Sequence, residues 1–338
     1  MYQWSGIENW NFYMPECPLV SFMVFSYNQE QFIRDAVKSA FKQTYEPLEI
    51  IFSDDCSPDQ TFKIIKKEAD AYRGPHKIIL NRNAKNMGLS GNINSAFAIA
   101  KGHFFVMAAG DDISVPTRTV DLVRRWQNKN DTVDYVSSFF EDMDVNGNPI
   151  PLSSTLIRQN AVYLPDVNLP VYKWRCGVTG ACAGFNRKLY DKYGPLDIQV
   201  IAEDGIFPFR AWLESGIAQI EKPLVKKRTH PDSLYVIQCN INKLKQAESR
   251  RLLRRQTLLN TLARTKDWLR SWQIAGKDKG TLVEVELKQW IRLLELEWQA
   301  NNSSRMQALR IAIVSLGYGV VGMRAAARLV IRHVLRLQ

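Results

Sequence analysis

The sequence predicts an α/β fold of the nucleotide-binding type, in which parallel strands alternate with helices. Apolar runs at residues 19–26, 48–52 and 103–107 are long enough for buried strands and too short for helices. The stretches between them place apolar residues at helical spacing, and such alternation is typical of a parallel sheet with right-handed crossovers. The 338 residues suit one large domain with an appendage.

The first half of the chain carries this alternation most clearly. We expect strands at residues 19–26, 48–52, 77–80 and 103–107, and helices at 31–43, 61–72 and 92–100. In the first helix, Ile33, Ala36, Val37, Ala40 and Phe41 share one face. Residues 86–91 are expected to form a loop.

The pattern is looser in the second half. We expect helices at residues 117–128, 187–192 and 206–216, and strands at 134–140 and 219–228. Asn146-Gly147 predicts a hairpin-type turn. Pro223 lies within the last strand, which favours an edge position because proline cannot donate to a neighbouring strand. From about residue 241 the chain is expected to be helical, with breaks at 276–280 and 301–304.

Three acidic pairs fall in loops of this predicted fold. Asp54-Asp55 and Asp111-Asp112 follow buried strands, and Glu203-Asp204 precedes a helix. Ligands of open α/β sheets bind outside the carboxyl ends of the strands. Adjacent carboxylates repel each other unless a cation neutralises them, and Mg²⁺ prefers oxygen ligands. A solvated turn with Asp111 capping the next helix is the alternative for the second pair.

Several segments together resemble a family-2 glycosyltransferase of the kind that builds bacterial cell-surface glycans. They are residues 20–28, 40–45 and 51–61, then Asn86-Met87-Gly88, Asn94, Gly110-Asp111-Asp112 and Glu203-Asp204, in the order of the family. The resemblance covers about residues 18–235. It implies the GT-A fold, a Rossmann-like mixed sheet flanked by helices that binds a nucleotide sugar.

The resemblance also implies roles for individual residues. The donor contacts would come from Ser26, Tyr27, Asn28, Asp55, Asn86, Gly88 and Asp111. Asp112 matches the family's metal-binding carboxylate and would hold Mn²⁺ or Mg²⁺, although the sequence has Gly-Asp-Asp-Ile where the family has Asp-x-Asp. A metal there stabilises charge on the departing diphosphate.

Asp204 matches the family's catalytic base, which removes the proton of the acceptor hydroxyl in an inverting transfer. Glu203 would support it. The alternative is that both are first-turn charges favoured by the helix dipole. His230 is a further metal contact or a lone surface histidine, and Arg228 and Trp174 are supporting or acceptor residues. Gly180 and Phe185 also fall where relatives build the acceptor pocket.

Charge is distributed unevenly along the chain. Residues 1–240 hold 26 Lys and Arg against 27 Asp and Glu, whereas residues 241–338 hold 19 against 7. The basic region predicts an anionic partner. The five cysteines have no paired spacing, which favours a reducing, cytoplasmic location and excludes a disulfide framework.

The C-terminal hundred residues lie outside the resemblance. Arg324, Arg328, Arg332 and Arg336 recur every fourth residue, after an uncharged run at 311–323. A bilayer span needs about 20 apolar residues, so an amphipathic helix on the inner membrane surface fits better. Trp268, Trp272, Trp290 and Trp298 are compatible with that location. A helical bundle packed on the catalytic domain is the alternative, and nothing indicates nucleic-acid binding.

We therefore expect three parts: a lead-in segment at residues 1–17, a catalytic domain at 18–240 and a basic helical region at 241–338. Within the catalytic domain, residues 18–115 would bind the nucleotide sugar and 116–240 the acceptor. The predicted function is transfer of a sugar from a nucleoside diphosphate, with UDP favoured, to a hydroxyl of a glycan or lipid-linked glycan. The alternative is a non-catalytic nucleotide-sugar-binding scaffold that docks through its basic tail.

Overall fold

The computed structural model describes residues 17–128, 130, 132–150, 178–201, 203–231, 233, 247–277 and 281–301, together with positions 307, 311, 314 and 315. The expected lead-in segment, Trp174 and most of the arginine-rich tail lie outside these residues. Among the helices within them, none has the length and apolar character needed to cross a membrane.

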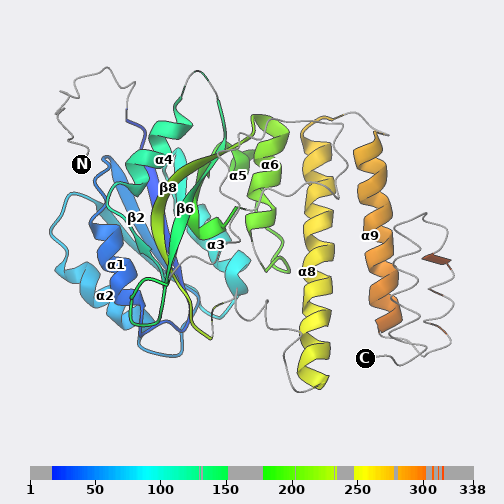
Figure 1. Ribbon diagram of the computed structural model, residues 1–338, viewed down its shortest axis with the longest axis horizontal. Coiled ribbons are helices and arrows are strands. Elements are labelled where there is room, and N and C mark those ends of the chain that lie inside the picture. The colour runs from blue at the N-terminus through cyan, green and yellow to red at the C-terminus, as the bar shows by residue number, and fades with distance from the viewer. Residues whose placement is uncertain are drawn as a thin grey trace.

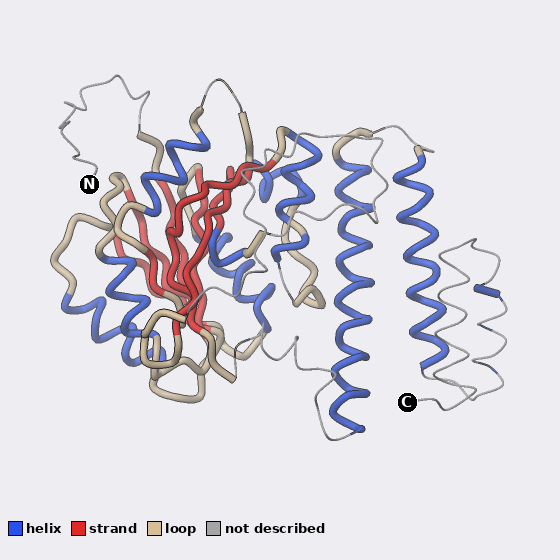
Figure 2. The backbone as a smooth tube through the Cα atoms, viewed as in Figure 1, coloured by secondary structure: helices blue, strands red, loops and turns tan. Residues whose placement is uncertain are grey.

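A single mixed sheet is built from strands between residues 20 and 228 (Figure 2). Its strands run in the order β3–β2–β1–β4–β7–β6–β8–β5. The strands are β1 (Val20–Ser26), β2 (Leu48–Asp54), β3 (Lys77–Arg82), β4 (Phe104–Ala109), β5 (Ile113–Ser114), β6 (Tyr135–Met143), β7 (Ala183–Asn186) and β8 (Ile217–Arg228). The first four are parallel, and β7 is antiparallel to both of its neighbours. This mixed sheet confirms the predicted α/β fold.

Helices cover both faces of the sheet. In β1, Val20, Phe22 and Val24 belong to a core shared with α1, α2 and α4, whereas Met23 and Phe25 belong to a second core shared with α3, α5 and α6. This division follows from the alternation of side chains along a strand. The helices are α1 (Ile33–Phe41), α2 (Thr61–Ala71), α3 (Gly88–Ile99), α4 (Arg118–Trp126), α5 (Lys188–Tyr193) and α6 (Phe207–Glu214).

Two long helices of the basic region follow the sheet, α8 (Ala247–Ile274) and α9 (Leu282–Asn301), and α8 stands beside α6 (Figure 1). Trp268 and Trp272 of α8 are 4% and 1% exposed and lie in the same core as α6. The suggestion that these two tryptophans lie at a membrane surface is therefore wrong. Their large apolar surfaces are buried against the protein itself.

Three local expectations need correction. Helix α3 begins at Gly88, so it includes part of the segment expected as a loop. Strand β7 was missed because it has only four residues and carries no alternating pattern. Strand β8 was expected at the edge, yet its Val225 and Lys226 pair with β5. Pro223 nevertheless lies at an irregularity in the pairing with β6, where a proline is tolerated.

Candidate active site

The first part of the site is the shared edge where β1, β2, β3 and β4 end. Asp55 N donates to Ser26 O at 2.9 Å, Asn83 N to Asp54 O at 2.9 Å, and Gly110 N to Phe25 O at 2.8 Å. Because these strands are parallel and adjacent, the loops that follow them leave the sheet on the same side. The acidic pairs after β2 and β4 therefore lie at one edge, as predicted.

Short polar contacts join the turn after β1 to the loop after β2. Asn28 N donates to Ser57 Oγ at 2.9 Å, and Gln29 N donates to Thr61 Oγ1 at 2.8 Å. Asn28 has a φ of +55°, in the left-handed region that asparagine adopts more readily than most residues. This turn leaves Tyr27 46% exposed. Its ring is free of the core and available for stacking on a ligand.

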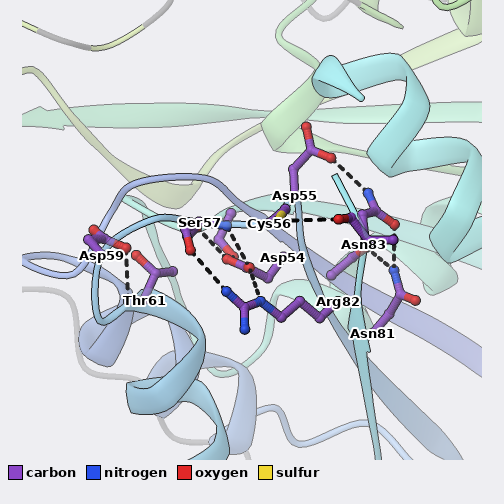
Figure 3. A network of polar contacts seen from close by, with 12 residues as sticks. Asp54, Asp55, Cys56, Ser57, Asp59, Thr61, Asn81, Arg82 and Asn83 are labelled. Carbon is purple, nitrogen blue, oxygen red and sulfur yellow. Dashed lines mark hydrogen bonds and ion pairs between the residues drawn. The ribbon is translucent and has the colours of Figure 1, made fainter. Parts of the chain in front are cut away.

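Asp54 is a structural residue rather than a free carboxylate (Figure 3). It is buried, and it accepts hydrogen bonds from Ser57 N at 2.9 Å, from the Ser57 hydroxyl and from Ser26 Oγ at 3.4 Å. Arg82 Nε lies 3.5 Å from Asp54 Oδ2, the oxygen that accepts from Ser57 N. The predicted donor contact Ser26 is itself buried and turned toward Asp54. Asp54 therefore shapes the loop that presents Asp55.

Asp55 holds the loop that precedes α3. Its Oδ1 accepts from Asn83 Nδ2 at 2.8 Å and from Met87 N at 2.9 Å (Figure 3). Asn86 Oδ1 in turn accepts from Gly88 N at 2.9 Å, and Gly88 has a φ of +74°. The structure thus brings the predicted donor residues Asp55, Asn86 and Gly88 together. Sequence reasoning missed Asn83, which directly follows β3, because the predicted strand ended at residue 80, two residues before the observed one.

The second acidic pair meets the end of β8. Asp112 is buried, and its Oδ1 accepts from Arg228 N at 2.9 Å. His230 Nε2 lies 2.9 Å from Asp111 Oδ2. Asp112 N donates to Ala109 O at 3.3 Å, which closes the turn after β4. The histidine therefore contacts the first carboxylate of the pair, while the backbone of β8 contacts the second.

Arg228 ties this loop to two other segments. Its Nε donates to Asp111 O at 3.0 Å and its Nη1 to Val145 O at 2.8 Å, while its Nη2 lies 3.1 Å from Asp35 Oδ2 in α1. The Phe32 ring packs against the guanidinium at 4.9 Å. Arg228 is 3% exposed, so its contacts are with the protein. Arg228 thus joins the Asp111-Asp112 loop to α1 and to residue 145.

The side chains here suit a divalent metal in part. Burial, together with the charge of Asp111, raises the pKa of Asp112 to about 8, so a nearby cation would stabilise its ionised form. Carboxylate oxygens are the ligands that Mn²⁺ and Mg²⁺ prefer. No group of three His, Cys, Asp or Glu side chains is arranged as a metal site in the part of the chain that the structure describes. A metal held by Asp112 and Asp111 therefore needs substrate oxygens to complete its coordination, as Mg²⁺ commonly does.

The third acidic pair forms a short 3₁₀ turn, Glu203–Gly205, ahead of α6. A β-carbon added to Gly180 would lie 1.8 Å from Glu203 Oε1, so a larger residue at this position would displace the Glu203 carboxylate. Burial and the charge of Asp204 raise the pKa of Glu203 to about 7. Burial also raises the pKa of Asp204, although the positive charges of Arg264 and Lys227 lower it in part. Lys227 directly precedes Arg228 in β8, and Arg228 contacts Asp112. The Glu203-Asp204 pair therefore lies near the strand end that contacts the Asp111-Asp112 pair.

Two residues predicted for the acceptor pocket have different outcomes. Trp174 lies outside the described residues. Phe185 is 1% exposed and stacks on Phe207 with ring centroids 4.4 Å apart, so it is a core residue and that expectation is wrong. Phe185 is buried because it lies on β7, a strand that the sequence did not reveal.

Comparison with known proteins agrees with this geometry. The model of the family described as "Glycosyl transferase family 2" matches residues 21–194. An uncharacterized glycosyltransferase of Haemophilus influenzae is 34% identical over 128 residues, which are 38% of each chain. WfaP of Escherichia coli, named as a UDP-Glc:alpha-D-GlcNAc-diphosphoundecaprenol beta-1,3-glucosyltransferase, is 33% identical over 123 residues, 36% of this chain and 47% of WfaP. The chain thus aligns with less than half of the length of these relatives.

Solved structures share the fold. Staphylococcus aureus TarS in complex with UDP-GlcNAc superimposes with a TM-score of 0.52 and 17% identity, over 91% of this chain and 87% of TarS. The Pyrobaculum calidifontis mannosyltransferase PcManGT, in complex with GDP-Man and Mn²⁺, gives a TM-score of 0.50 and 15% identity, over 95% and 88% of the two chains. At these identities the likeness establishes the GT-A fold.

Proposed function

The chain belongs to glycosyltransferase family 2 and is a glycosyltransferase, and we propose that it transfers a sugar with inversion from a nucleoside diphosphate to a hydroxyl of a glycan or lipid-linked glycan. The observation that supports this most is the placement of three acidic loops. Asp55 follows β2 and the Asp111-Asp112 pair follows β4, the two strands on either side of β1, and the Glu203-Asp204 pair lies near Lys227 of β8. A transfer needs this combination of donor, leaving-group and acceptor contacts.

The donor would bind at the edge formed by β1, β2 and β3. Tyr27 offers an exposed aromatic face, and the Asp55 carboxylate can accept a hydrogen bond from a nucleobase or ribose. UDP is the favoured nucleotide, because TarS has been solved with UDP-GlcNAc and WfaP is named for UDP-Glc. PcManGT was solved with GDP-Man, so a guanosine donor is the alternative that an experiment has to exclude.

Asp111 and Asp112 would hold Mn²⁺ or Mg²⁺ on the diphosphate. A bound metal supplies Lewis-acid stabilisation of the departing nucleoside diphosphate. Arg228 N donates a backbone hydrogen bond to Asp112, which fixes its carboxylate, and the side chain of His230 contacts the Asp111 carboxylate through Nε2. The presence of Mn²⁺ in PcManGT supports a metal in this fold.

Asp204 would act as the general base. Its carboxylate lies in a loop of the expected acceptor half, residues 116–240, and it would accept the proton of the attacking hydroxyl as that oxygen bonds to the anomeric carbon. Glu203 is packed against Gly180 and keeps the loop in place. The raised pKa of Asp204 makes it a stronger base than an exposed aspartate.

A lipid-linked acceptor would place the enzyme at the inner face of the cytoplasmic membrane. WfaP is named for an acceptor of this kind, and the basic C-terminal region could bind the anionic surface. We therefore propose a cytoplasmic enzyme that associates peripherally with the membrane.

A panel of nucleotide sugars tests the proposal directly. Purified protein with Mn²⁺ is heated with UDP-glucose, UDP-GlcNAc or GDP-mannose, and the unfolding temperature is recorded. A donor raises it by mass action. We expect a UDP-sugar to give the largest increase and EDTA to reduce it. Absence of any shift across the panel would contradict donor binding.

A further inference from the structure

Helix α8 lies against the loop that carries Asp204. It stands beside α6 (Figure 1), and its Trp268 and Trp272 are buried in the core that α6 shares. Asn260, Arg264 and Trp268 are four residues apart, so they line one face of the helix. This face meets Ile201 and Gly205, on either side of Asp204.

Two hydrogen bonds fix the ends of that segment. Asn260 Oδ1 accepts from Ile201 N at 2.7 Å, and the buried Trp268 Nε1 donates to Gly205 O at 2.6 Å. The backbone on both sides of Asp204 is therefore bonded to the same helix. A loop held at both ends keeps its side chains in a narrow range of orientations.

Arg264 lies between these two contacts. A β-carbon added to Gly205 would come within 2.6 Å of Arg264 Cδ and 3.4 Å of its Nη1. The guanidinium carbon is 5.2 Å from the centroid of the Trp268 ring. The arginine side chain therefore crosses directly over Gly205, next to the proposed base.

The charged groups that act on Asp204 come from three elements. Glu203 is its neighbour in the loop, Lys227 comes from β8 and Arg264 from α8. Burial raises the pKa of Asp204, and Arg264 and Lys227 act in the opposite direction. Without Arg264, a greater share of Asp204 would be protonated at a given pH.

We propose that α8 is part of the active centre: its Asn260–Arg264–Trp268 face holds the loop 201–205, and Arg264 is a positioning residue for the Asp204 carboxylate. This rests on the proposed function in that Asp204 is taken as the general base. The family model ends at residue 194, so the segment that supports the base lies outside the matched region. The C-terminal region then contributes to catalysis besides any contact with a membrane.

Hydrogen exchange of the full-length protein tests the support of the loop without an activity assay. We expect Asn260→Leu, which removes the acceptor for Ile201 N, to speed exchange in peptides covering residues 201–206 by about tenfold. Asn260→Asp keeps an acceptor oxygen and should retain most of the protection. Trp268→Phe, which removes the donor to Gly205 together with part of the buried ring, should act in the same direction as Asn260→Leu. Exchange in β1 reports any general loss of stability.

The pH dependence of donor turnover tests Arg264. The assay measures release of nucleoside diphosphate, with water as the acceptor, from the nucleotide sugar that stabilises the protein most. We expect Arg264→Met to move the acid limb of kcat/KM up by about one pH unit, which is about tenfold in rate at a pH below the limb. Arg264→Lys should restore most of the shift. Lys266→Met, which breaks a half-exposed ion pair between α8 and Glu295 of α9, should leave the profile unchanged.

The outcomes separate this inference from the proposed function. A wild-type pH profile in Arg264→Met would remove Arg264 from the site. Unchanged exchange in both Asn260→Leu and Trp268→Phe would show that α8 does not hold the loop. If Asp204→Asn keeps full turnover, the base assignment fails instead, while the exchange result still decides whether α8 supports the loop.

Discussion

In each acidic pair, the two neighbouring carboxylates meet different partners. Asp54 is enclosed by Ser57 and Arg82, whereas Asp55 reaches the loop before α3. Adjacent side chains in a loop point in different directions, so each one samples a separate environment. The assignment of roles at the residue scale therefore depends on partners that are distant in the sequence.

Replacing Asp204 by Asn should abolish turnover. The amide cannot accept the proton of the acceptor, and loss of a general base costs about 10²–10⁴-fold in rate. Donor binding, followed by the thermal shift with a nucleotide sugar, should stay close to wild type because Asp204 lies outside the proposed donor contacts. Glu203→Gln is the matched control and should keep most of the activity. Turnover that survives in Asp204→Asn would show that another group is the base.

Replacing Asp112 by Asn should remove the effect of metal on donor binding. The amide oxygen can still accept from Arg228 N, so the turn is preserved while the charge is lost. We expect the increase in unfolding temperature given by a UDP-sugar to become independent of Mn²⁺. Asp121→Asn, on the surface of α4, is the control. Full wild-type activity in the presence of EDTA would contradict a role for the metal.

Stability should depend on the protonation of Glu203. Its pKa rises from 4.5 unfolded to about 7 in the native state, so the native protein binds the extra proton between these pH values. The contribution of Glu203 to the free energy of unfolding is therefore largest below pH 4.5, and this contribution is lost as the pH rises toward 7. Glu203→Gln should flatten that fall, by on the order of 3 kcal/mol at most. Urea unfolding across this range measures it, and equal slopes in both proteins would contradict the assignment.

At the scale of elements, α8 is joined to α6 by a buried ion pair. Arg210 Nη2 lies 2.8 Å from Asp267 Oδ2, and the two side chains are 0% and 3% exposed. Ser271 and Arg270 also donate to Asp267. Such a pair stabilises the fold only while both partners are present. The first helix of the basic region is thus packed as part of the domain.

Replacing Asp267 by Ala should destabilise the protein by about 3 kcal/mol, because it leaves the buried, charged Arg210 without its carboxylate partner. The hydrogen bond from Arg210 Nη1 to Gly194 O would remain. Asp70→Ala breaks the exposed pair with Lys66 and should change the free energy of unfolding by less than about 0.5 kcal/mol. Urea unfolding of both variants provides the test. Equal effects would mean that the buried pair does not hold α8.

Strand β7 shows why one element escaped prediction. It joins β4 to β6, yet its Gly184 contributes no side chain to a pattern. A β-carbon at Gly184 would lie 2.5 Å from the ring of Phe104, so glycine is needed where β7 pairs with β4. The position of this strand depends on its pairing with β4 and β6. Periodicity within four residues is too short to reveal it.

At the scale of the whole molecule, the positive charge is concentrated after the catalytic domain. Residues 302–338 contain six arginines and no acidic residue. An anionic membrane attracts such a segment. The packing of α8 and α9 makes them part of the folded body, which leaves these last residues as the proposed membrane contact.

A chain that ends after Asn301 should fold but lose its binding to vesicles that contain anionic lipid. Sedimentation with such vesicles, and with neutral phosphatidylcholine as the control, measures the difference. A chain that ends after residue 246 should unfold or aggregate, because it exposes the core that Trp268 and Trp272 cover. Unchanged sedimentation of the first truncation would contradict the membrane contact.

The sequence alone determined the α/β alternation, the positions of the acidic loops and the family. Helical and strand periods are properties of short segments, and parallel strands end at a common edge whatever their packing. Tertiary structure decided the rest. His230 meets Asp111 across 119 residues, and Trp268 meets Gly205 across 63. Contacts over such separations arise only when the whole core has formed, so neither the partner of each carboxylate nor the place of α8 beside Asp204 could be predicted from local patterns.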